Sequence, residues 1–516
     1  MIPHLAEARQ PDLSDALSFS REAAPIDHAA ELKRGALTNT VALLASNFRG
    51  VFTFLVARIL GAAALGTFLV AWNAVEILSK LSLFGLENTT IAFIARAEAA
   101  GDRARSRSLS LLALFLALTQ SLFVAAVSLL ALQFFGQRFG LDPRVIASLT
   151  ILLCALPGIS LYAINTAVSR GMKVMRHDIF SRGLTESTVT SVAFLIALWI
   201  GARTFGPAYA AVAGTTASGI VALVLARSLF RSFPQSAAFA YRAEATRMLS
   251  YSAHISIYEL LNAVIVRLDV IMLASFIGRA PGVTLPVVGI YGAVMEVAGG
   301  LRKVNQSFNP IFAPVIAGLT AHGEQDRAAA AFSRVAQWML WVLVPLLAVM
   351  VFAGGTILSI YGPAFREGSL WLIIVALACG TNAFVGLAET VIMVQKPRVN
   401  VVNSAVTCAV AFAANIFLIR HFGVMGAAFG ILLPYVLLGV LRYRALRSVF
   451  RWRNPWANIS PPFLGAILAL PLALLCRLTI HGIAGEILSA LAFLAVYFIA
   501  WRHHRARNPL QNTENV

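Results

Sequence analysis

Charged side chains are scarce in this sequence. Asp, Glu, Lys and Arg together make up only 12% of its 516 residues, whereas hydrophobic residues make up 59%. An ordinary soluble protein has about 25% charged residues, so this shortage excludes a soluble globular fold. It indicates a polytopic membrane protein with helical spans, because a helix satisfies its own backbone hydrogen bonds in lipid.

Acidic residues are the rarer of the two signs of charge, and the formal net charge is +18. A strongly basic chain can bind nucleic acid. Here, however, the Arg residues stand in short loops between apolar runs, which is the pattern of the positive-inside rule. We therefore expect no nucleic-acid partner.

Cysteines and catalytic motifs are also few. The 4 cysteines lie in or beside apolar runs without a C-x-x-C pair, so we expect them to pack as small apolar residues. The sequence has no H-E-x-x-H, P-loop or paired-carboxylate pattern, which predicts neither an enzyme nor a metal or organic cofactor. The segment 1–34 lacks an apolar core and carries several acids, so it reads as a polar tail and not as a signal peptide.

Apolar runs long enough to span a bilayer, about 20 residues each, recur along the chain. They predict an all-α polytopic membrane protein of about 14 transmembrane helices, as two parallel six-helix repeats plus two extra C-terminal helices. The predicted units are a polar cytoplasmic tail at 1–35, an N-lobe of six helices at 36–231, a C-lobe of six helices at 247–447, two further helices at 460–501 and a cytoplasmic tail at 502–516.

The second half of the chain repeats the first at a nearly fixed offset. Gly61 and Gly278 stand in similar local sequence, and the same offset relates Gly206 to Gly423. A slightly larger offset relates Gly66 to Gly289, and the difference predicts a longer loop at 279–286 in the second half. Parallel repeats of this kind are typical of transporters that bind substrate between two lobes.

The Lys and Arg residues predict the orientation. With the N-terminus in the cytoplasm, 26 of them flank the cytoplasmic ends of the predicted helices and 8 flank the opposite ends. Since positive residues are retained on the cytoplasmic side, we expect both termini to be cytoplasmic.

Five basic residues remain inside predicted spans: Arg49, Lys80, Arg267, Arg302 and Lys303. A charge at the centre of a membrane helix costs about 2.5–3.5 kcal/mol on insertion scales, so these side chains must pair, reach the interface or line a wet cavity. Lys80 and Lys303 are related by the same offset as Gly66 and Gly289, so they hold equivalent places in the two lobes. A cavity on the pseudo-twofold axis would then be positive and suited to a phosphate or pyrophosphate.

The alternative for these cations is internal pairing. Glu76 stands four residues before Lys80, the favoured order for an ion pair on a helix, whereas Gly299 stands at the matching place before Lys303. A substrate-facing role is therefore expected first for Lys303 and next for Lys80. The arginines are equally suited to bracing the lobes.

Acidic residues cluster in the second lobe. Glu259 and Asp269 fall in the seventh predicted helix, where their spacing favours a shared polar face, and Glu389 falls in the tenth. These three are candidate sites for a coupling H⁺ or Na⁺. The alternative, that they neutralise nearby Arg and Lys residues, stays open.

Four loose motifs, taken in order and spacing, carry a family resemblance over residues 36–450. They are Arg58-Ile-Leu-Gly with Leu65-Gly-Thr-Phe, Arg267-Leu-Asp-Val-Ile-Met-Leu with Val288-Gly-Ile-Tyr-Gly-Ala, Ile360-Tyr-Gly-Pro-Ala-Phe, and Gly423-Val-Met-Gly-Ala-Ala. The chain resembles the polysaccharide (O-antigen or exopolysaccharide type) flippases of the MATE-like superfamily.

This resemblance implies two six-helix bundles in a V around a central cavity, with alternating access. The implied activity moves a polyprenyl-pyrophosphate-linked oligosaccharide to the external leaflet for surface polysaccharide or lipopolysaccharide biosynthesis. It also implies a monomer in the bacterial inner membrane, in contact with membrane lipids and working beside a polysaccharide polymerase and glycosyltransferases.

Other classes fit the sequence less well. MATE-type drug/cation antiporters often carry an acidic residue in the first helix, and 36–60 contains none. Lipid II flippases carry an Arg-rich early signature and an E-G-A-F-like motif that do not occur here. A membrane-embedded glycan polymerase or transferase needs a catalytic constellation, usually on a sizeable external loop, whereas the external loops here have about 4–12 residues.

Overall fold

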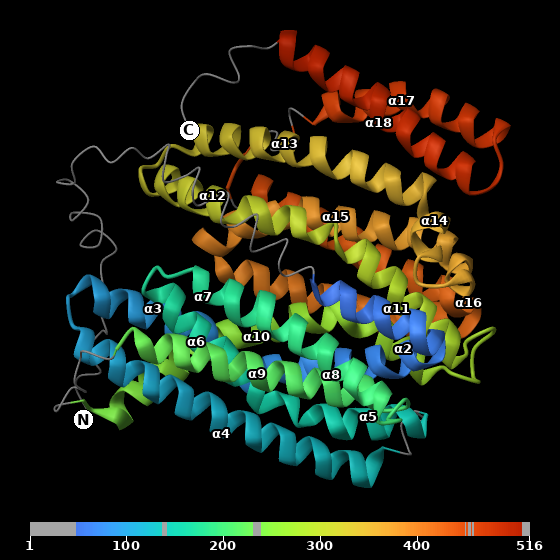
Figure 1. Cartoon of the computed structure of the whole chain (residues 1–516). Helices are drawn as coiled ribbons and strands as arrows, with labels where there is room; N and C mark the ends of the chain where they lie inside the picture. Colours follow the sequence, from blue (N-terminus) through green and yellow to red (C-terminus); the bar gives the residue numbers. More distant parts are fainter. Residues whose placement is uncertain are drawn as a thin grey trace.

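A computed structural model describes residues 48–136, 142–230, 239–448, 450–452, 456 and 459–507 (Figure 1). Its first half consists of α2 (Phe48–Leu83), α3 (Leu86–Ala99), α4 (Arg103–Phe135), α5 (Pro143–Leu153), α6 (Ala155–Gly171), α7 (Arg176–Asp178), the π-helix η2 (Ile179–Glu186), α8 (Ser187–Trp199) and α9 (Gly206–Ser228). Its second half consists of α10 (Tyr241–Ser275), α11 (Leu285–Gly299), α12 (Arg302–Ala321), α13 (Gln325–Phe352), α14 (Gly354–Ser359), the 3₁₀-helix η3 (Pro363–Gly368), α15 (Ser369–Gln395), α16 (Pro397–Ser448), α17 (Ser460–Thr479) and α18 (Gly482–Arg507).

The all-α polytopic fold is confirmed. Within the described ranges nine helices are long and apolar enough to cross a membrane, and ten if α5 and α6, bent by 43°, form one span. Two of the nine, α2 and α16, each run through a kink where a glycine leaves helical geometry, at Gly61 and Gly423. The number of fourteen spans and the lobe boundaries stay predictions.

The chain folds into two bundles that lie side by side. In Figure 1 the blue-to-green helices of the first half form the lower bundle, and the yellow-to-red helices of the second half form the upper one. At their junction α11 packs along α2, and α10 packs against both α2 and α16. The extra pair α17 and α18 packs on α13 at the outer edge of the second half.

The two halves approach most closely at a pair of glycines that the repeat maps onto each other. A Cβ on Gly66 would lie 2.6 Å from the carbonyl oxygen of Leu285, and a Cβ on Gly289 would collide with the carbonyl oxygen of Ala62. Only glycine lets the backbones of α2 and α11 come this near, as is common where membrane helices cross. The repeat axis therefore passes near this contact.

A second pair of repeat-related glycines shares a positive φ angle. Gly61 has φ 82° and Gly278 has φ 70°, in the left-handed region that residues with a Cβ avoid. After Gly61 the chain continues in α2. After Gly278 it forms the loop between α10 and α11, where the sequence predicts the longer connection at 279–286.

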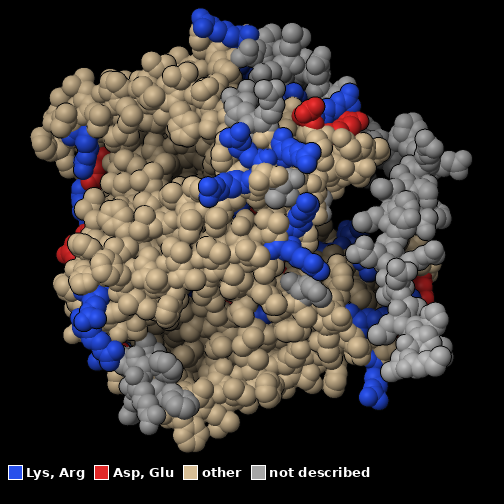
Figure 2. Space-filling view, turned by 180° about the vertical axis from the view of Figure 1, so that it is seen from behind, with Lys and Arg blue, Asp and Glu red and all other residues tan. Residues whose placement is uncertain are grey.

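Basic side chains gather at one end of the bundles. That end, called the basic end below, carries Arg96, Arg103, Arg105 and Arg170 at the turns around α3, α4 and α6. In Figure 2 most of the visible Lys and Arg side chains lie on the right-hand half, which is the side of α3 and α7 in Figure 1. The glycine contact between α2 and α11 lies toward the opposite end.

Candidate functional site

A polar cavity of about 420 Å³ lies between the two halves. Its wall is built from α2 and η2 of the first half and from α10, α11 and α12 of the second. The charged residues that line it are Glu76, Arg182, Glu186, Arg267, Glu296, Arg302 and Lys303. Seven charged side chains thus line one cavity of a mostly apolar membrane protein.

One ion pair crosses the cavity from one half to the other. The Arg267 Nε on α10 donates to the Glu76 Oε2 on α2 at 2.6 Å. The sequence suggested that Glu76 pairs with Lys80, one helical turn away, and this expectation is wrong. The side chain of Lys80 instead lies near the carboxylates of Glu259 on α10 and Glu87 on α3.

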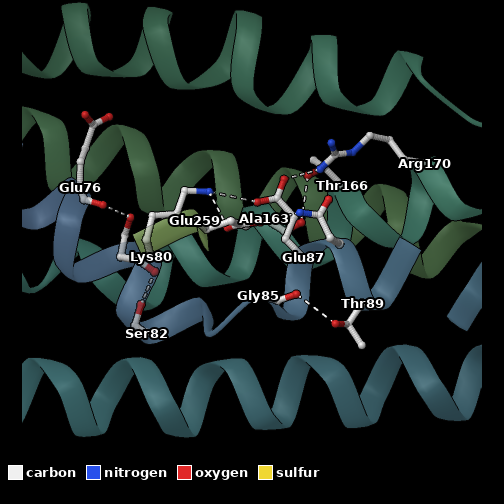
Figure 3. A network of polar contacts seen from close by, with 12 residues as sticks. Glu76, Lys80, Ser82, Gly85, Glu87, Thr89, Ala163, Thr166, Arg170 and Glu259 are labelled. Atoms are coloured by element: carbon white, nitrogen blue, oxygen red, sulfur yellow. Dashed lines mark hydrogen bonds and ion pairs between the residues drawn. The ribbon is translucent and has the colours of Figure 1, made fainter. Parts of the chain in front are cut away.

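Lys80 belongs to a separate polar network nearer the basic end (Figure 3). Its Nζ lies 3.3 Å from Glu259 and 3.8 Å from Glu87, and Glu87 also accepts from Arg170 at 2.6 Å. The second carboxylate oxygen of Glu259 accepts from the Asn88 amide. Among the described residues Lys80 does not line the cavity, so the structure does not bring it together with Lys303.

Lys303 and Arg302 line the cavity at the point where α11 gives way to α12. Gly299 and Gly300 form this junction and line the same wall. The Arg302 Nη1 is buried and has no hydrogen-bond partner within the described part of the chain. The side chain of Arg49 lies outside the described residues. Binding of substrate by these cations stays a prediction, but the structure gathers Arg267, Arg302 and Lys303 around one cavity.

Two charged residues of the wall were not predicted from the sequence. Arg182 and Glu186 stand one turn apart on η2, a π-helix, which is a rare geometry that is frequent at functional sites. Arg182 also lies 5.6 Å from the ring of Tyr162. Arg182 is one of the 26 basic residues that the positive-inside rule assigns to the cytoplasmic ends of the predicted helices. The signal that could have found the pair is that both charges fall at the start of the apolar stretch 180–201.

Two aromatic residues complete the wall. Trp72 on α2 and Tyr361, between α14 and η3, line the cavity with the amides of Asn73 and Gln306. Tyr361 also packs against the rings of Phe54 and Phe365, so it is both a packing residue and a part of the cavity wall.

The three candidate coupling acids lie at separate places outside the cavity wall described above. Asp269 is buried and its Oδ2 accepts from the Tyr291 hydroxyl at 2.7 Å. Glu389 accepts from Arg442 at 2.7 Å and from the Tyr258 hydroxyl. Glu259 pairs with Lys80 on α2, whereas Asp269 binds Tyr291 on α11. The two acids therefore do not form the shared polar cluster that their spacing suggests.

This architecture has known relatives. Residues 32–319, more than half of the chain, match the family described as "Polysaccharide biosynthesis protein". The chain belongs to this family. It is accordingly a multi-pass membrane protein of a polysaccharide biosynthesis family, with a charged cavity between its two halves.

A curated relative points the same way. Over 204 residues the chain is 24% identical to the "Probable flippase AglR" of Haloferax volcanii (strain DS2). That match covers 39% of this chain and 41% of the relative, so the similarity spans about two fifths of the relative's length.

Solved structures share the fold at low sequence identity. An inward-facing multidrug resistance MATE family transporter of the MOP superfamily superposes with a TM-score of 0.63 at 14% identity, over 79% of this chain and 94% of that one. The lipid II flippase MurJ, in an inward closed conformation, gives 0.63 at 10% identity over 91% and 99%. These likenesses establish a fold common to the MATE transporters and the lipid II flippase.

Proposed function

We propose that the protein is a flippase that moves a polyprenyl-pyrophosphate-linked oligosaccharide across the membrane by alternating access of its two halves. The observation that carries this proposal is the cavity between the halves, with Arg182 on one wall and Arg267, Arg302 and Lys303 on the other. Clustered guanidinium and ammonium groups recognise phosphates through charge-assisted hydrogen bonds. The family match supplies the link to polysaccharide biosynthesis.

The remaining wall residues suit a sugar next to the phosphates. Trp72 and Tyr361 offer flat apolar faces. The amides of Asn73 and Gln306 can donate hydrogen bonds to sugar hydroxyl groups and accept from them, and the carboxylates of Glu186 and Glu296 can accept from them. A cavity of about 420 Å³ is within the usual range of roughly 300–1,000 Å³ for ligand sites. It accommodates the pyrophosphate and its first sugars, and the lipid tail stays in the bilayer.

The protein acts in this proposal as a transporter and not as an enzyme. Glycosyltransferases build its lipid-linked substrate on the cytoplasmic side, and a polymerase extends the exported glycan into lipopolysaccharide O-antigen or exopolysaccharide. The protein works as a monomer in the bacterial inner membrane.

The proposed orientation places the basic end in the cytoplasm, with both termini on that side, because anchoring charges accumulate there. A reporter fused after Val516 should be active only in its cytoplasmic form. A reporter inserted at Pro281–Gly282, in the loop between α10 and α11, should be active only in its external form. The same sidedness at both places would contradict this topology.

Lys303→Glu tests the function directly. It places a negative charge where the pyrophosphate binds, so glycan export should fail and the lipid-linked precursor should accumulate inside, at normal protein level. Lys303→Arg keeps the charge and should retain part of the export. Lys396→Glu, at an exposed turn between α15 and α16, is the matched control and should export at the parental rate.

A MATE-type drug/cation antiporter is the second candidate function. The observation that favours it is the pair of carboxylates, Glu186 and Glu296, in the cavity wall. Parental export by Lys303→Glu, together with drug sensitivity on deletion of the protein, would favour the antiporter.

A further inference from the structure

The ion pair between Glu76 and Arg267 lies at a different location from the other ion pairs that join the two halves, Lys80 with Glu259 and Arg105 with Glu244. It lies inside the cavity, and it joins α2 of the first half to α10 of the second. Both side chains remain partly accessible, 21% for Glu76 and 25% for Arg267. The pair is therefore short and well formed, yet a ligand that enters the cavity can reach it.

The repeat shows that this bridge exists on one side of the pseudo-twofold axis. Gly50 is the repeat equivalent of Arg267, by the same offset that relates Gly61 to Gly278. Gly299 is the repeat equivalent of Glu76, by the same offset that relates Gly66 to Gly289. Gly50 and Gly299 both line the same cavity. At the place related by symmetry, glycines thus replace both partners of the bridge.

We propose that Glu76 is a built-in anion, which occupies Arg267 in the empty cavity and is displaced from it by a phosphate group of the substrate. This inference rests on the proposed flippase function and deepens it. The displacement exchanges a contact between the two halves for a contact between one half and the substrate. Substrate binding thereby releases α2 from α10 at the level of the cavity.

The charges of the cavity favour this exchange when a pyrophosphate is present. A pyrophosphate carries more negative charge than a carboxylate and offers more acceptor oxygens, and Arg302 and Lys303 on the same wall also attract it. Without substrate, Glu76 offsets the cost of holding the Arg267 charge within the membrane. The cavity is polar, so the phosphate can replace the Glu76 carboxylate while Arg267 keeps an anionic partner throughout the exchange.

The first experiment measures the affinity of the purified full-length protein in nanodiscs for farnesyl pyrophosphate, a short isoprenoid that carries the same headgroup. Glu76→Gln removes the competing carboxylate and should bind the probe on the order of tenfold more tightly than the parent, a typical coupling factor. Arg267→Gln should bind it more weakly. Glu244→Gln is the control, because Glu244 pairs with Arg105 and Arg247 at the basic end, outside the cavity.

The second experiment measures the distance between the halves. Spin labels at Ala100→Cys and Ala243→Cys, both exposed near the basic end, report on α10 relative to the first half in a background without the native cysteines. The probe should change the distance distribution of the parent. Glu76→Gln should show the changed distribution before the probe is added.

The outcomes separate this inference from the proposed function. If the parent does not bind farnesyl pyrophosphate, the lipid-pyrophosphate function and the displacement both fail. If the parent binds the probe but Glu76→Gln binds it no more tightly, only the displacement is overturned.

Discussion

The two seams between the halves are related by the repeat, yet they differ in chemistry. Along one seam, polar side chains of the first half meet α10: Glu76 with Arg267, Lys80 with Glu259, Thr89 with Ser252 and Arg105 with Glu244. On the other seam, the positions equivalent to the cavity bridge hold Gly50 and Gly299. A duplicated backbone has thus become asymmetric through its side chains.

Besides these two seams, the halves also meet near the repeat axis, and the two kinds of contact hold them together in different ways. The glycine contact of α2 with α11 depends on shape, because backbone meets backbone without room for a methyl group. The seam of α10 depends on charge, and charged contacts can be exchanged for a ligand. Variants that disturb the backbone contact should therefore have larger effects than variants that change charged contacts.

Gly289→Ala should have the largest effect. The new methyl group collides with the backbone of α2 at Ala62, which cannot move aside like a flexible side chain. Overpacking costs about 1–3 kcal/mol or more, so thermal unfolding in detergent should shift downward and the protein level should fall. Gly318→Ala on α12 is the control, since its methyl group meets no atom within 4 Å. Equal stability of the two variants would contradict the close contact.

A second ion pair, built on the seam that holds Gly50 and Gly299, should block transport. Gly50→Arg combined with Gly299→Glu places the missing pair at the equivalent positions, and both have room for a side chain, because Gly50 faces open space and Gly299 meets only the end of Arg302. Glycan export should fall about tenfold, as expected for roughly 1.4 kcal/mol of added constraint, at near-parental protein level. Parental export by the double variant would show that the asymmetry of the seams has no functional role.

Lys80→Gln should affect stability more than export. It leaves Glu87 and Glu259 less neutralised, but the side chain of Lys80 is 35% exposed, so the loss should be about 1 kcal/mol or less. Lys303→Gln should reduce export more strongly, because Lys303 lines the cavity. Export and protein level measured together distinguish the two. If Lys80→Gln lost more export than Lys303→Gln, Lys80 would have to be counted among the substrate-binding residues.

Neutralising the candidate coupling acids should have the smallest effect on total export. If transport is ion-coupled through Asp269 or Glu389, then Asp269→Asn, Glu389→Gln and their combination should lose dependence on the ion gradient at normal protein level. Export into membrane vesicles with and without an imposed H⁺ or Na⁺ gradient measures this. Unchanged gradient dependence in all three variants would discard these acids as coupling groups.

Much of the fold follows from local sequence. The apolar runs predict an all-α membrane protein because their length matches the bilayer. The offset relates Gly61 to Gly278, and both glycines have positive φ. The repeat also maps Gly66 onto Gly289, although nothing in the sequence says that they touch.

The site was predicted only in part. Arg267, Arg302 and Lys303 were found because charges inside an apolar run are costly and therefore conspicuous. Arg182 was missed because it lies close to the start of its run, where a basic residue usually marks the membrane surface. The π-helix from Ile179 to Glu186 carries it on the cavity wall, and neither hydrophobic periodicity nor charge counting detects that geometry.

The sequence by itself determined the membrane environment, the duplication and part of the set of charges inside the membrane, because these depend on composition and on spacing along the chain. Only the tertiary structure decided which charges meet. Glu76 binds Arg267, far away in the sequence, in preference to Lys80 on the next turn of its own helix. The physical reason is that a helical neighbour gains only about 0.2–0.5 kcal/mol, so the approach of α10 to α2 overrides it.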